Sequence, residues 1–173
     1  MNEGLIHLYH GKGKGKTTAA MGLCLRALGS GKKVAVIQFL KDGSSSELKV
    51  LKALPNVEVE TASKTVFSFA MTEKDREKAT NDCAELFEKA RQIALNGAQV
   101  LLLDEICAAV KKGFLDSAVV EDFLKTKPKK LEIILTGREP LDFMLEAADY
   151  ITEMLCQKHP YEKGIKAREG IEY

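Results

Sequence analysis

The run His10-Gly11-Lys12-Gly13-Lys14-Gly15-Lys16-Thr17-Thr18 constrains the fold more than any other stretch of this 173-residue chain. An apolar segment at residues 5–9 leads into it, and a helical pattern over residues 19–28 follows it. A strand, a glycine-rich loop, a Lys-Thr pair and a helix in this order are typical of a phosphate-binding loop. A flexible basic turn is the alternative, and the flanking strand and helix argue against it.

The residue types of this loop fit the binding of a polyphosphate. Glycines allow backbone N–H groups to turn inward and form a concave anion nest, and the following helix N-terminus adds partial positive charge. Lys16 is placed to reach phosphate oxygens, and the Thr17 hydroxyl is placed to hold Mg²⁺. The spacing is unusual, because His10 stands where the general pattern has its first glycine, so the loop is one residue short.

A second motif lies about ninety residues downstream, where the apolar residues 100–103 are followed by Asp104 and Glu105. A buried parallel strand delivers such carboxylates to its C-terminal end. In a phosphate-loop fold that end lies beside the loop, where acids bind Mg²⁺ directly or through water. Arg138 also follows an apolar strand pattern and could meet phosphate, an acidic substrate or a structural acid.

Periodicity predicts an α/β fold for the whole chain, treated as a single domain over residues 1–173. Strands and helices alternate, which is typical of a doubly wound, mostly parallel sheet with helices on both faces and ligands at the carboxyl ends of the strands. Strands are expected at residues 5–9, 33–39, 57–61, 100–103, 131–135 and 150–155, and helices at 19–28, 44–54, 72–96, 117–125 and 140–148.

Three features have more than one interpretation. Gln38, at the end of one strand, could face a ligand or satisfy local backbone groups. Residues 62–71 could pack as a strand or carry aromatic side chains to a ligand, with packing favoured. The polar tail at residues 158–173 resembles a lid or a surface-wrapping arm more than a core element.

Composition excludes several classes of protein. A net charge of +1 gives no global field for nucleic acid or a membrane surface. No segment resembles a signal peptide or reaches membrane-spanning length. The cysteines Cys24, Cys83, Cys107 and Cys156 are spread without a C-x-x-C pair, which favours reduced thiols in a cytoplasmic protein. From the residues alone the chain is expected to bind Mg²⁺ and ATP, and the reaction stays open.

Motifs along nearly the full length also match one known pattern. They are Gly11-Lys12-Gly13-Lys14-Gly15-Lys16-Thr17-Thr18-Ala19-Ala20, Val36-Ile37-Gln38-Phe39-Leu40-Lys41, Leu103-Asp104-Glu105, Lys112-Gly113-Phe114-Leu115, Thr136-Gly137-Arg138, Lys158-His159-Pro160-Tyr161, Gly164-Ile165-Lys166-Ala167 and Gly170-Ile171-Glu172-Tyr173. In these motifs the chain resembles the ATP:corrinoid (cob(I)alamin) adenosyltransferases of the phosphate-loop, RecA-like type. The tail motifs discriminate most, because generic phosphate-loop proteins lack them.

The resemblance implies transfer of the 5′-deoxyadenosyl group of ATP to the Co(I) of a reduced corrinoid, with release of triphosphate. It implies Lys16, Thr17 and Glu105 as catalytic residues, and Thr17 and Glu105 as ligands of Mg²⁺ or Mn²⁺ with Asp104 behind them. It implies that ATP lies in the opposite sense from ATP in a kinase. The implied ATP-binding residues are Gly11, Lys12, Gly13, Lys14, Gly15, Lys16, Thr17 and Thr18, with Arg138 as a further candidate.

The resemblance also assigns the aromatic stretch and the partners. Phe67 and Phe69 stand where the family uses a Phe-x-Trp pair to press on the corrinoid and displace its lower ligand, and this chain has Phe in place of Trp. A homodimer and an electron-donor protein such as a flavodoxin are implied. The alternatives are a phosphate-loop kinase or ATPase acting at the γ-phosphate, and a nucleotide-dependent binding module without transfer chemistry.

Overall fold

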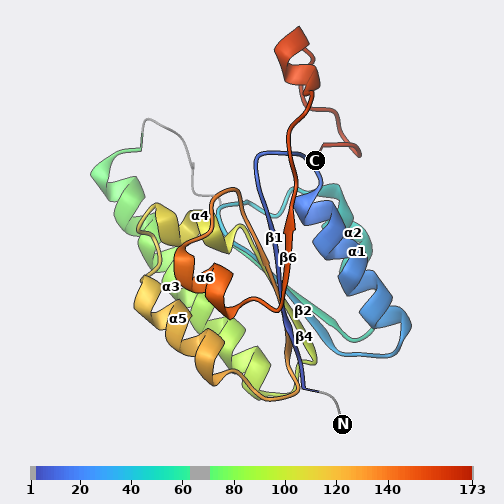
Figure 1. Cartoon of the computed structure of the whole chain (residues 1–173), viewed down its shortest axis with the longest axis vertical. Helices are drawn as coiled ribbons and strands as arrows, with labels where there is room; N and C mark the ends of the chain where they lie inside the picture. The colour runs from blue at the N-terminus through green and yellow to red at the C-terminus, as the bar shows by residue number, and fades with distance from the viewer. Residues whose placement is uncertain (1–2, 63–70, 173) are drawn as a thin grey trace.

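The computed structural model describes residues 3–62 and 71–172, and in this part of the chain six parallel strands form one sheet in the order β3-β2-β4-β5-β1-β6 (Figure 1). The strands are β1 (Ile6–His10), β2 (Val34–Gln38), β3 (Val57–Thr61), β4 (Val100–Asp104), β5 (Glu132–Thr136) and β6 (Tyr150–Glu153). The helices are α1 (Lys16–Gly29), α2 (Ser46–Leu51), α3 (Glu73–Leu95), α4 (Ile106–Lys111), α5 (Ser117–Thr126) and α6 (Asp142–Ala147), with a 3₁₀ turn η1 (Pro160–Lys163).

Helices cover both faces of the sheet, as predicted (Figure 1). Alternate residues of a strand point to opposite faces, so β2 sends Val34 and Val36 into a core beneath α1 and α2. Ala35 and Ile37 enter a second core beneath α3 to α6. Because both faces are buried, the central strands read as continuous apolar runs rather than as alternating ones.

Several predicted elements are confirmed closely. The strand at 57–61 is β3, and it lies at one edge of the sheet. The long helix α3 begins with a capping box, in which the Asp75 N–H donates to Thr72 Oγ1 at 3.2 Å and the Thr72 N–H donates to Asp75 Oδ2 at 3.0 Å. The segment with Phe67 and Phe69, for which packing was the favoured interpretation, lies outside the described residues.

Three predictions need correction. The helix expected at 44–54 is only Ser46–Leu51; its N-cap is Ser45, without a side-chain capping bond, so the expected Ser44–Glu47 capping box does not form. The helix expected to open at Pro140 begins at Asp142, after an extended Leu141. The short helix α4 was not predicted, because six residues are too few to show a helical period.

All strand carboxyl ends lie at one end of the sheet, where the phosphate loop, the segment after β2 and Glu105 meet. The tail also leaves the sheet at this end: it projects beyond β6 and turns back so that residues 170–172 lie near α1 and α2 (Figure 1). Most tail residues are exposed. Among the described residues, no helix is long and apolar enough to cross a membrane.

Candidate functional site

The glycine loop is fastened to the ends of the two strands that flank β1. The Gly11 N–H donates to the Arg138 carbonyl at 3.0 Å, and the Gly13 N–H donates to the Met154 carbonyl at 2.7 Å. A side chain at Gly13 would place its Cβ 2.7 Å from the Met154 and Leu155 carbonyl oxygens, which explains why only glycine fits there. The expectation that the loop N–H groups turn inward is therefore wrong for these two, which hold the loop in place.

The start of α1 supplies the N–H groups that remain for an anion. Gly15, at φ 112°, is the N-cap of this helix and provides no side-chain cap. The Ala19 N–H donates to the Gly15 carbonyl at 2.8 Å and so begins the helical hydrogen bonds. The N–H groups of Lys16, Thr17 and Thr18 come before it, so they are the unpaired donors of a helix N-terminus, to which a phosphate binds favourably.

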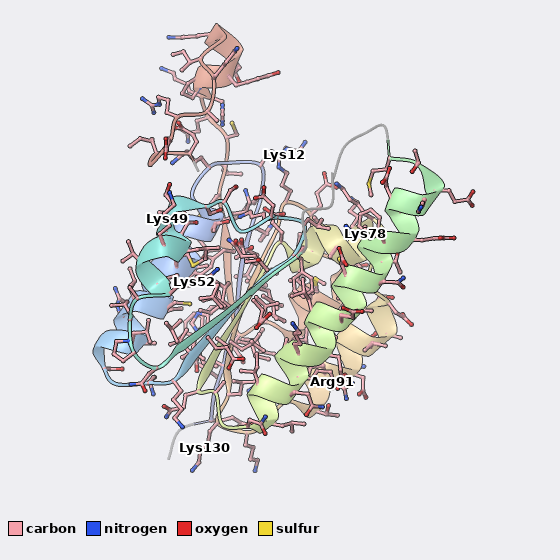
Figure 2. The ribbon with its side chains drawn as sticks, turned by 180° about the vertical axis from the view of Figure 1, so that it is seen from behind. Lys12, Lys49, Lys52, Lys78, Arg91 and Lys130 are labelled. Carbon is pink, nitrogen blue, oxygen red and sulfur yellow. The ribbon has the colours of Figure 1, made fainter. Side chains whose placement is uncertain are left out.

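Lys16 folds back over the loop, and its Nζ donates to the Gly13 carbonyl at 2.7 Å. An ammonium has three donors, so two remain for phosphate oxygens. Burial lowers the pKa of Lys16; attraction to Glu105 opposes this shift, and repulsion from Arg138 and Lys41 adds to it. The charges of these four side chains therefore belong to one electrostatic site. Lys12 and Lys14 of the same loop are exposed, and Figure 2 shows Lys12 at the surface.

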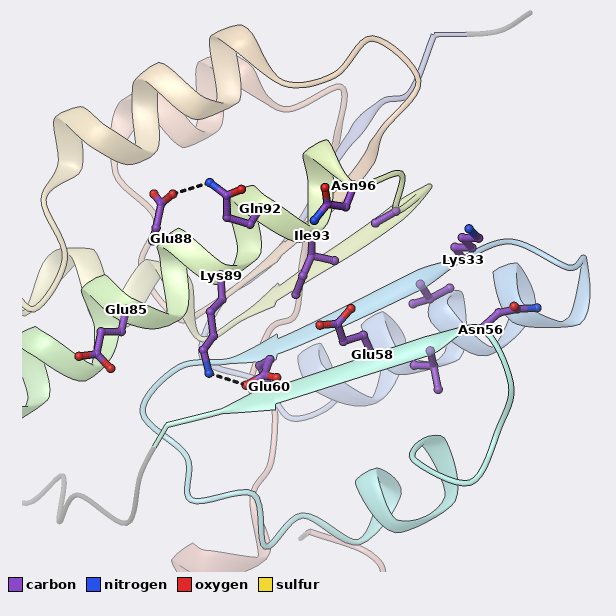
Figure 3. A pocket seen from close by; sticks show the side chains of 13 residues that line it. Lys33, Asn56, Glu58, Glu60, Glu85, Glu88, Lys89, Gln92, Ile93 and Asn96 are labelled. Carbon is purple, nitrogen blue, oxygen red and sulfur yellow. Dashed lines mark hydrogen bonds and ion pairs between the residues drawn. The ribbon is translucent and has the colours of Figure 1, made fainter.

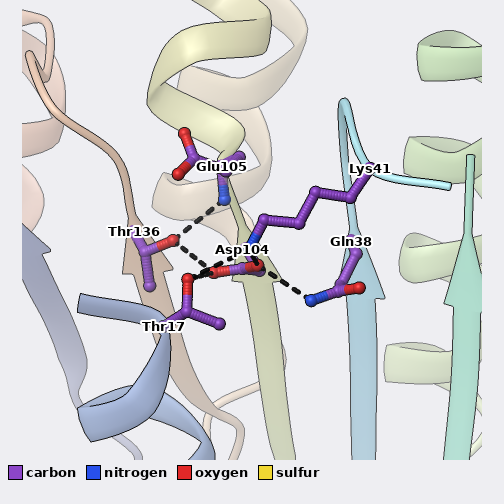
Figure 4. Close-up of polar contacts among 6 residues, drawn as sticks. All are labelled: Thr17, Gln38, Lys41, Asp104, Glu105 and Thr136. Atoms are coloured by element: carbon purple, nitrogen blue, oxygen red, sulfur yellow. Dashed lines mark hydrogen bonds and ion pairs between the residues drawn. The ribbon is translucent and has the colours of Figure 1, made fainter. Parts of the chain in front are cut away.

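Asp104 is the centre of the polar network at the strand ends (Figure 4). Its carboxylate is fully buried and accepts hydrogen bonds from four side chains. Thr17 Oγ1 and Thr136 Oγ1 donate to Oδ1 at 2.9 and 2.7 Å, and Gln38 Nε2 and Lys41 Nζ donate to Oδ2 at 3.1 and 2.7 Å. A carboxylate that accepts four hydrogen bonds orients the side chains that donate them. This fits the expectation that Asp104 supports the metal ligands and does not itself bind the metal directly.

Glu105 lies beside this network in a left-handed conformation, at φ 61°. It is the N-cap of α4, and its N–H donates to Thr136 Oγ1 at 2.9 Å. Burial raises the pKa of its carboxyl, and the neighbouring Asp104 charge raises it further. Lys41, Lys16 and Arg138 lower this pKa in turn, because their positive charges favour the ionised carboxylate.

Sequence reasoning missed Lys41 as a site residue and left Gln38 open. Gln38 is fully buried and binds Asp104, while its Oε1 has no hydrogen-bond partner in the described part of the chain. Thr136, also fully buried, was not singled out either. The relation among these residues depends on the strand order, which the structure shows. Because β2 and β5 flank β4, polar residues at their carboxyl ends must lie beside Asp104.

The residues present fit a magnesium ion held jointly with a nucleotide. In the described chain no group of three or more His, Cys, Asp or Glu side chains could hold a metal by itself. Mg²⁺ commonly takes one or two carboxylates and completes its octahedron with phosphate oxygens and water. The Thr17 hydroxyl and the Asp104 carboxylate already converge on one cation, the Lys41 ammonium, at 3.1 and 2.7 Å.

A cavity of about 1150 Å³ opens beside Thr17 and Thr18. It is bounded by α1, by the segment after β2 and by Gly170, Ile171 and Glu172 of the tail. The tail thus reaches the neighbourhood of the loop, as an arm over the site would. A second cavity of about 850 Å³ lies between α3 and β3, and none of the predicted site residues that the structure describes lines it (Figure 3).

Comparison with known proteins gives one consistent family. Residues 2–173 match the family model described as ATP:corrinoid adenosyltransferase BtuR/CobO/CobP. The chain is 36% identical over 171 residues to a corrinoid adenosyltransferase of Escherichia coli (strain K12), covering 98% of this chain and 86% of that protein. It is 35% identical over 173 residues to a corrinoid adenosyltransferase of Sinorhizobium sp, covering 99% of this chain and 81% of that protein.

Solved structures agree with the fold. A KaiC-like protein of Pyrococcus horikoshii OT3 superposes with a TM-score of 0.52 at 17% identity, over 91% of this chain and 75% of that chain. EssC (ATPases 2 and 3) of Geobacillus thermodenitrificans gives a TM-score of 0.53 at 15% identity, over 96% of this chain and 35% of that chain. At these identities the likeness concerns the fold alone, which is the predicted α/β, RecA-like phosphate-loop fold.

Proposed function

This chain belongs to the ATP:corrinoid adenosyltransferase family, and from that membership we propose that it transfers the 5′-deoxyadenosyl group of ATP to the Co(I) of a reduced corrinoid. The observation that carries the proposal is the meeting of Lys16, Thr17 and Asp104 at the strand ends of a chain that matches the family over residues 2–173. The ATP and corrinoid substrates follow from the family, and the Co(I) state and the triphosphate product are the finer part of the proposal.

The proposed step is a displacement at carbon. A lone pair of Co(I) attacks C5′ of ATP, a cobalt–carbon bond forms, and the C5′–O5′ bond breaks with its electron pair leaving on the triphosphate. Cobalt thereby becomes Co(III). Because Co(I) is itself a strong nucleophile, the reaction needs no Ser, Cys or His base, and the protein's task is alignment and stabilisation of the leaving group.

The chain's own residues are suited to that task. The Lys16 ammonium and the N–H groups at the start of α1 would bind the triphosphate, and developing negative charge there is stabilised by donors already in place. Thr17 and Glu105 would hold the magnesium ion, and Asp104 would orient Thr17 through their 2.9 Å hydrogen bond. A bound Mg²⁺ supplies further neutralisation of the triphosphate charge.

The proposal includes the pose of ATP. The loop is one residue short, and the Gly11 and Gly13 N–H groups are already bound to strand ends. We infer that this tight loop holds a whole triphosphate as a leaving group rather than presenting the γ-phosphate. An ATP complex with its γ-phosphate in the ordinary kinase position would refute this part.

The remaining parts rest on the family likeness. They are an aromatic wedge of Phe67 and Phe69 against the corrinoid, an electron-donor protein such as a flavodoxin, a homodimer and a cytoplasmic location. The dimer is tested by light scattering, which should give twice the 19.1 kDa of the chain.

The activity is tested by incubating the protein with ATP, Mg²⁺ and chemically reduced cobalamin. We expect a photolabile cobalt–carbon bond and stoichiometric triphosphate. Lys16→Ala should abolish transfer, and Lys52→Ala, which removes an exposed lysine at the end of α2, should not. Formation of ADP and phosphate in place of triphosphate would support the kinase or ATPase alternative and overturn the proposal.

A further inference from the structure

Lys41 contacts Thr17, which the proposed function assigns as a ligand of the metal ion. Its Nζ lies 2.7 Å from Asp104 Oδ2 and 3.1 Å from Thr17 Oγ1 (Figure 4). Thr17 Oγ1 donates its own proton to Asp104 Oδ1 at 2.9 Å, so it accepts the Lys41 hydrogen bond through a lone pair. A magnesium ion on the remaining lone pair of Thr17 Oγ1 would share this oxygen with the Lys41 ammonium, so the two cations would stand side by side.

Lys41 and a metal ion therefore compete for the surroundings of the Thr17 hydroxyl. Mg²⁺ binds oxygen ligands at about 2.0–2.1 Å, so a metal ion on Thr17 Oγ1 would lie close to an ammonium bound to the same oxygen. Like charges at such close range also repel strongly in a partly buried site. The lysine side chain, which is 28% exposed while Asp104 is fully buried, has an open path toward solvent.

The backbone keeps Lys41 in place while leaving its side chain free to swing. The Phe39 N–H is fixed to the Asp104 carbonyl at 2.9 Å, and the Phe39 side chain is fully buried. Leu40 then takes a left-handed conformation, at φ 55°, which a leucine adopts only when its surroundings impose it. This turn directs Lys41 back over the end of β2 toward Asp104, so the side chain can leave without disturbing the strand.

We propose that the Lys41 ammonium is a built-in counter-ion that binds Asp104 and the metal ligand Thr17 in the nucleotide-free enzyme and passes to the triphosphate when metal and nucleotide enter. The proposal rests on the metal–ATP site of the proposed function. It gives Lys41 two successive partners: the buried Asp104 carboxylate before binding, and phosphate oxygens after it. Lys16 and Arg138 lie in the same electrostatic site, so the displaced ammonium would join further cations that can bind phosphate oxygens.

The test uses Mn²⁺ and inorganic tripolyphosphate as probes, with the Lys41→Met variant. Nucleotide-free protein is titrated with Mn²⁺, and free Mn²⁺ is followed by its electron paramagnetic resonance signal. Because the competing charge is gone, we expect Lys41→Met to bind Mn²⁺ about tenfold tighter than the unchanged protein. Tripolyphosphate with saturating Mn²⁺ is then titrated by calorimetry, and here the variant should bind about tenfold weaker.

The proposal thus predicts tighter Mn²⁺ binding but weaker tripolyphosphate binding. If Lys41 only stabilised the fold, its replacement would weaken both affinities. Lys41→Gln keeps a hydrogen-bond donor toward Asp104 but lacks the charge, so it should change both affinities in the same directions. It replaces the Met variant in the test if that variant does not fold. Lys52→Met, on the exposed end of α2, is the matched control and should change neither affinity.

Unchanged or weaker Mn²⁺ binding in both Lys41 variants would overturn the counter-ion role. Unchanged tripolyphosphate binding would overturn the transfer of Lys41 to the phosphates. Neither probe contains a corrinoid or an adenosyl group, so the result stands apart from the adenosyl-transfer assay: either one can fail while the other succeeds.

Discussion

Asp104→Asn should destabilise the nucleotide-free protein by about 3 kcal/mol, because it removes the charge at the centre of the strand-end network. The buried carboxylate accepts from Thr17, Thr136, Gln38 and Lys41. The Lys41 ammonium and the Gln38 amide nitrogen can only donate, so the single oxygen of asparagine must stay on their side. Its NH₂ then faces the two threonine hydroxyls, which lose their acceptor.

The magnitude follows from these losses. The two threonine hydroxyls lose hydrogen bonds to a charged carboxylate, and at the lower value for such bonds each loss is about 1.5 kcal/mol. Lys41 is partly exposed and keeps an oxygen acceptor, so the lost ion pair adds little and the total is about 3 kcal/mol. For a chain of this length that corresponds to a melting temperature roughly 6–12 °C lower.

The assay is urea unfolding followed by circular dichroism, without nucleotide or metal. The midpoint should fall while the slope of free energy against urea concentration stays unchanged. Asp122→Asn removes an exposed acid from α5 and is the matched control, expected within about 0.5 kcal/mol of the unchanged protein. An Asp104→Asn protein as stable as this control would refute the view that the network stabilises the fold.

Three further predictions concern the site. Gly13→Ala should lower ATP affinity at least about tenfold, since its Cβ would meet the Met154 carbonyl oxygen at 2.7 Å, whereas Gly29→Ala, whose Cβ meets nothing within 4 Å, should not. Because burial and Asp104 raise the pKa of Glu105 above its ordinary value, a falling pH should protonate it early and weaken Mn²⁺–ATP binding; Glu105→Gln should bind weakly throughout and lose this pH dependence. Phe69→Ala should impair adenosylation of Co(II) substrate supplied with a reductant more than that of pre-reduced Co(I) substrate, and equal losses would argue against the wedge.

The parts of the site that the sequence predicts are those carried by one continuous segment. The loop after β1 and the acids after β4 each show a strand pattern next to polar residues, so the local pattern is enough to place both at a strand end. The sheet's layers follow in the same way, since continuous apolar strands alternate with amphipathic helices.

The parts that the sequence does not predict depend on which strands are neighbours. Lys41 reads as one more residue of a polar loop, and only the placement of β2 next to β4 brings it to Asp104. The engagement of the Gly11 and Gly13 N–H groups likewise depends on β5 and β6 flanking β1. Pairings between residues 63 or more positions apart leave no local pattern in the sequence.

The position of β1 in the sheet has a consequence for how this protein is made. Its neighbours β5 and β6 come from the last third of the chain, and the Met154 carbonyl that fastens Gly13 comes later still. During synthesis the phosphate loop is translated early, yet it cannot take its final shape until about 140 further residues have left the ribosome. Contacts of such long range slow folding, so the nascent chain must keep its first strand unpaired for most of its translation. A ribosome-bound chain arrested before β6 should accordingly bind ATP poorly, even though every residue of the loop is present.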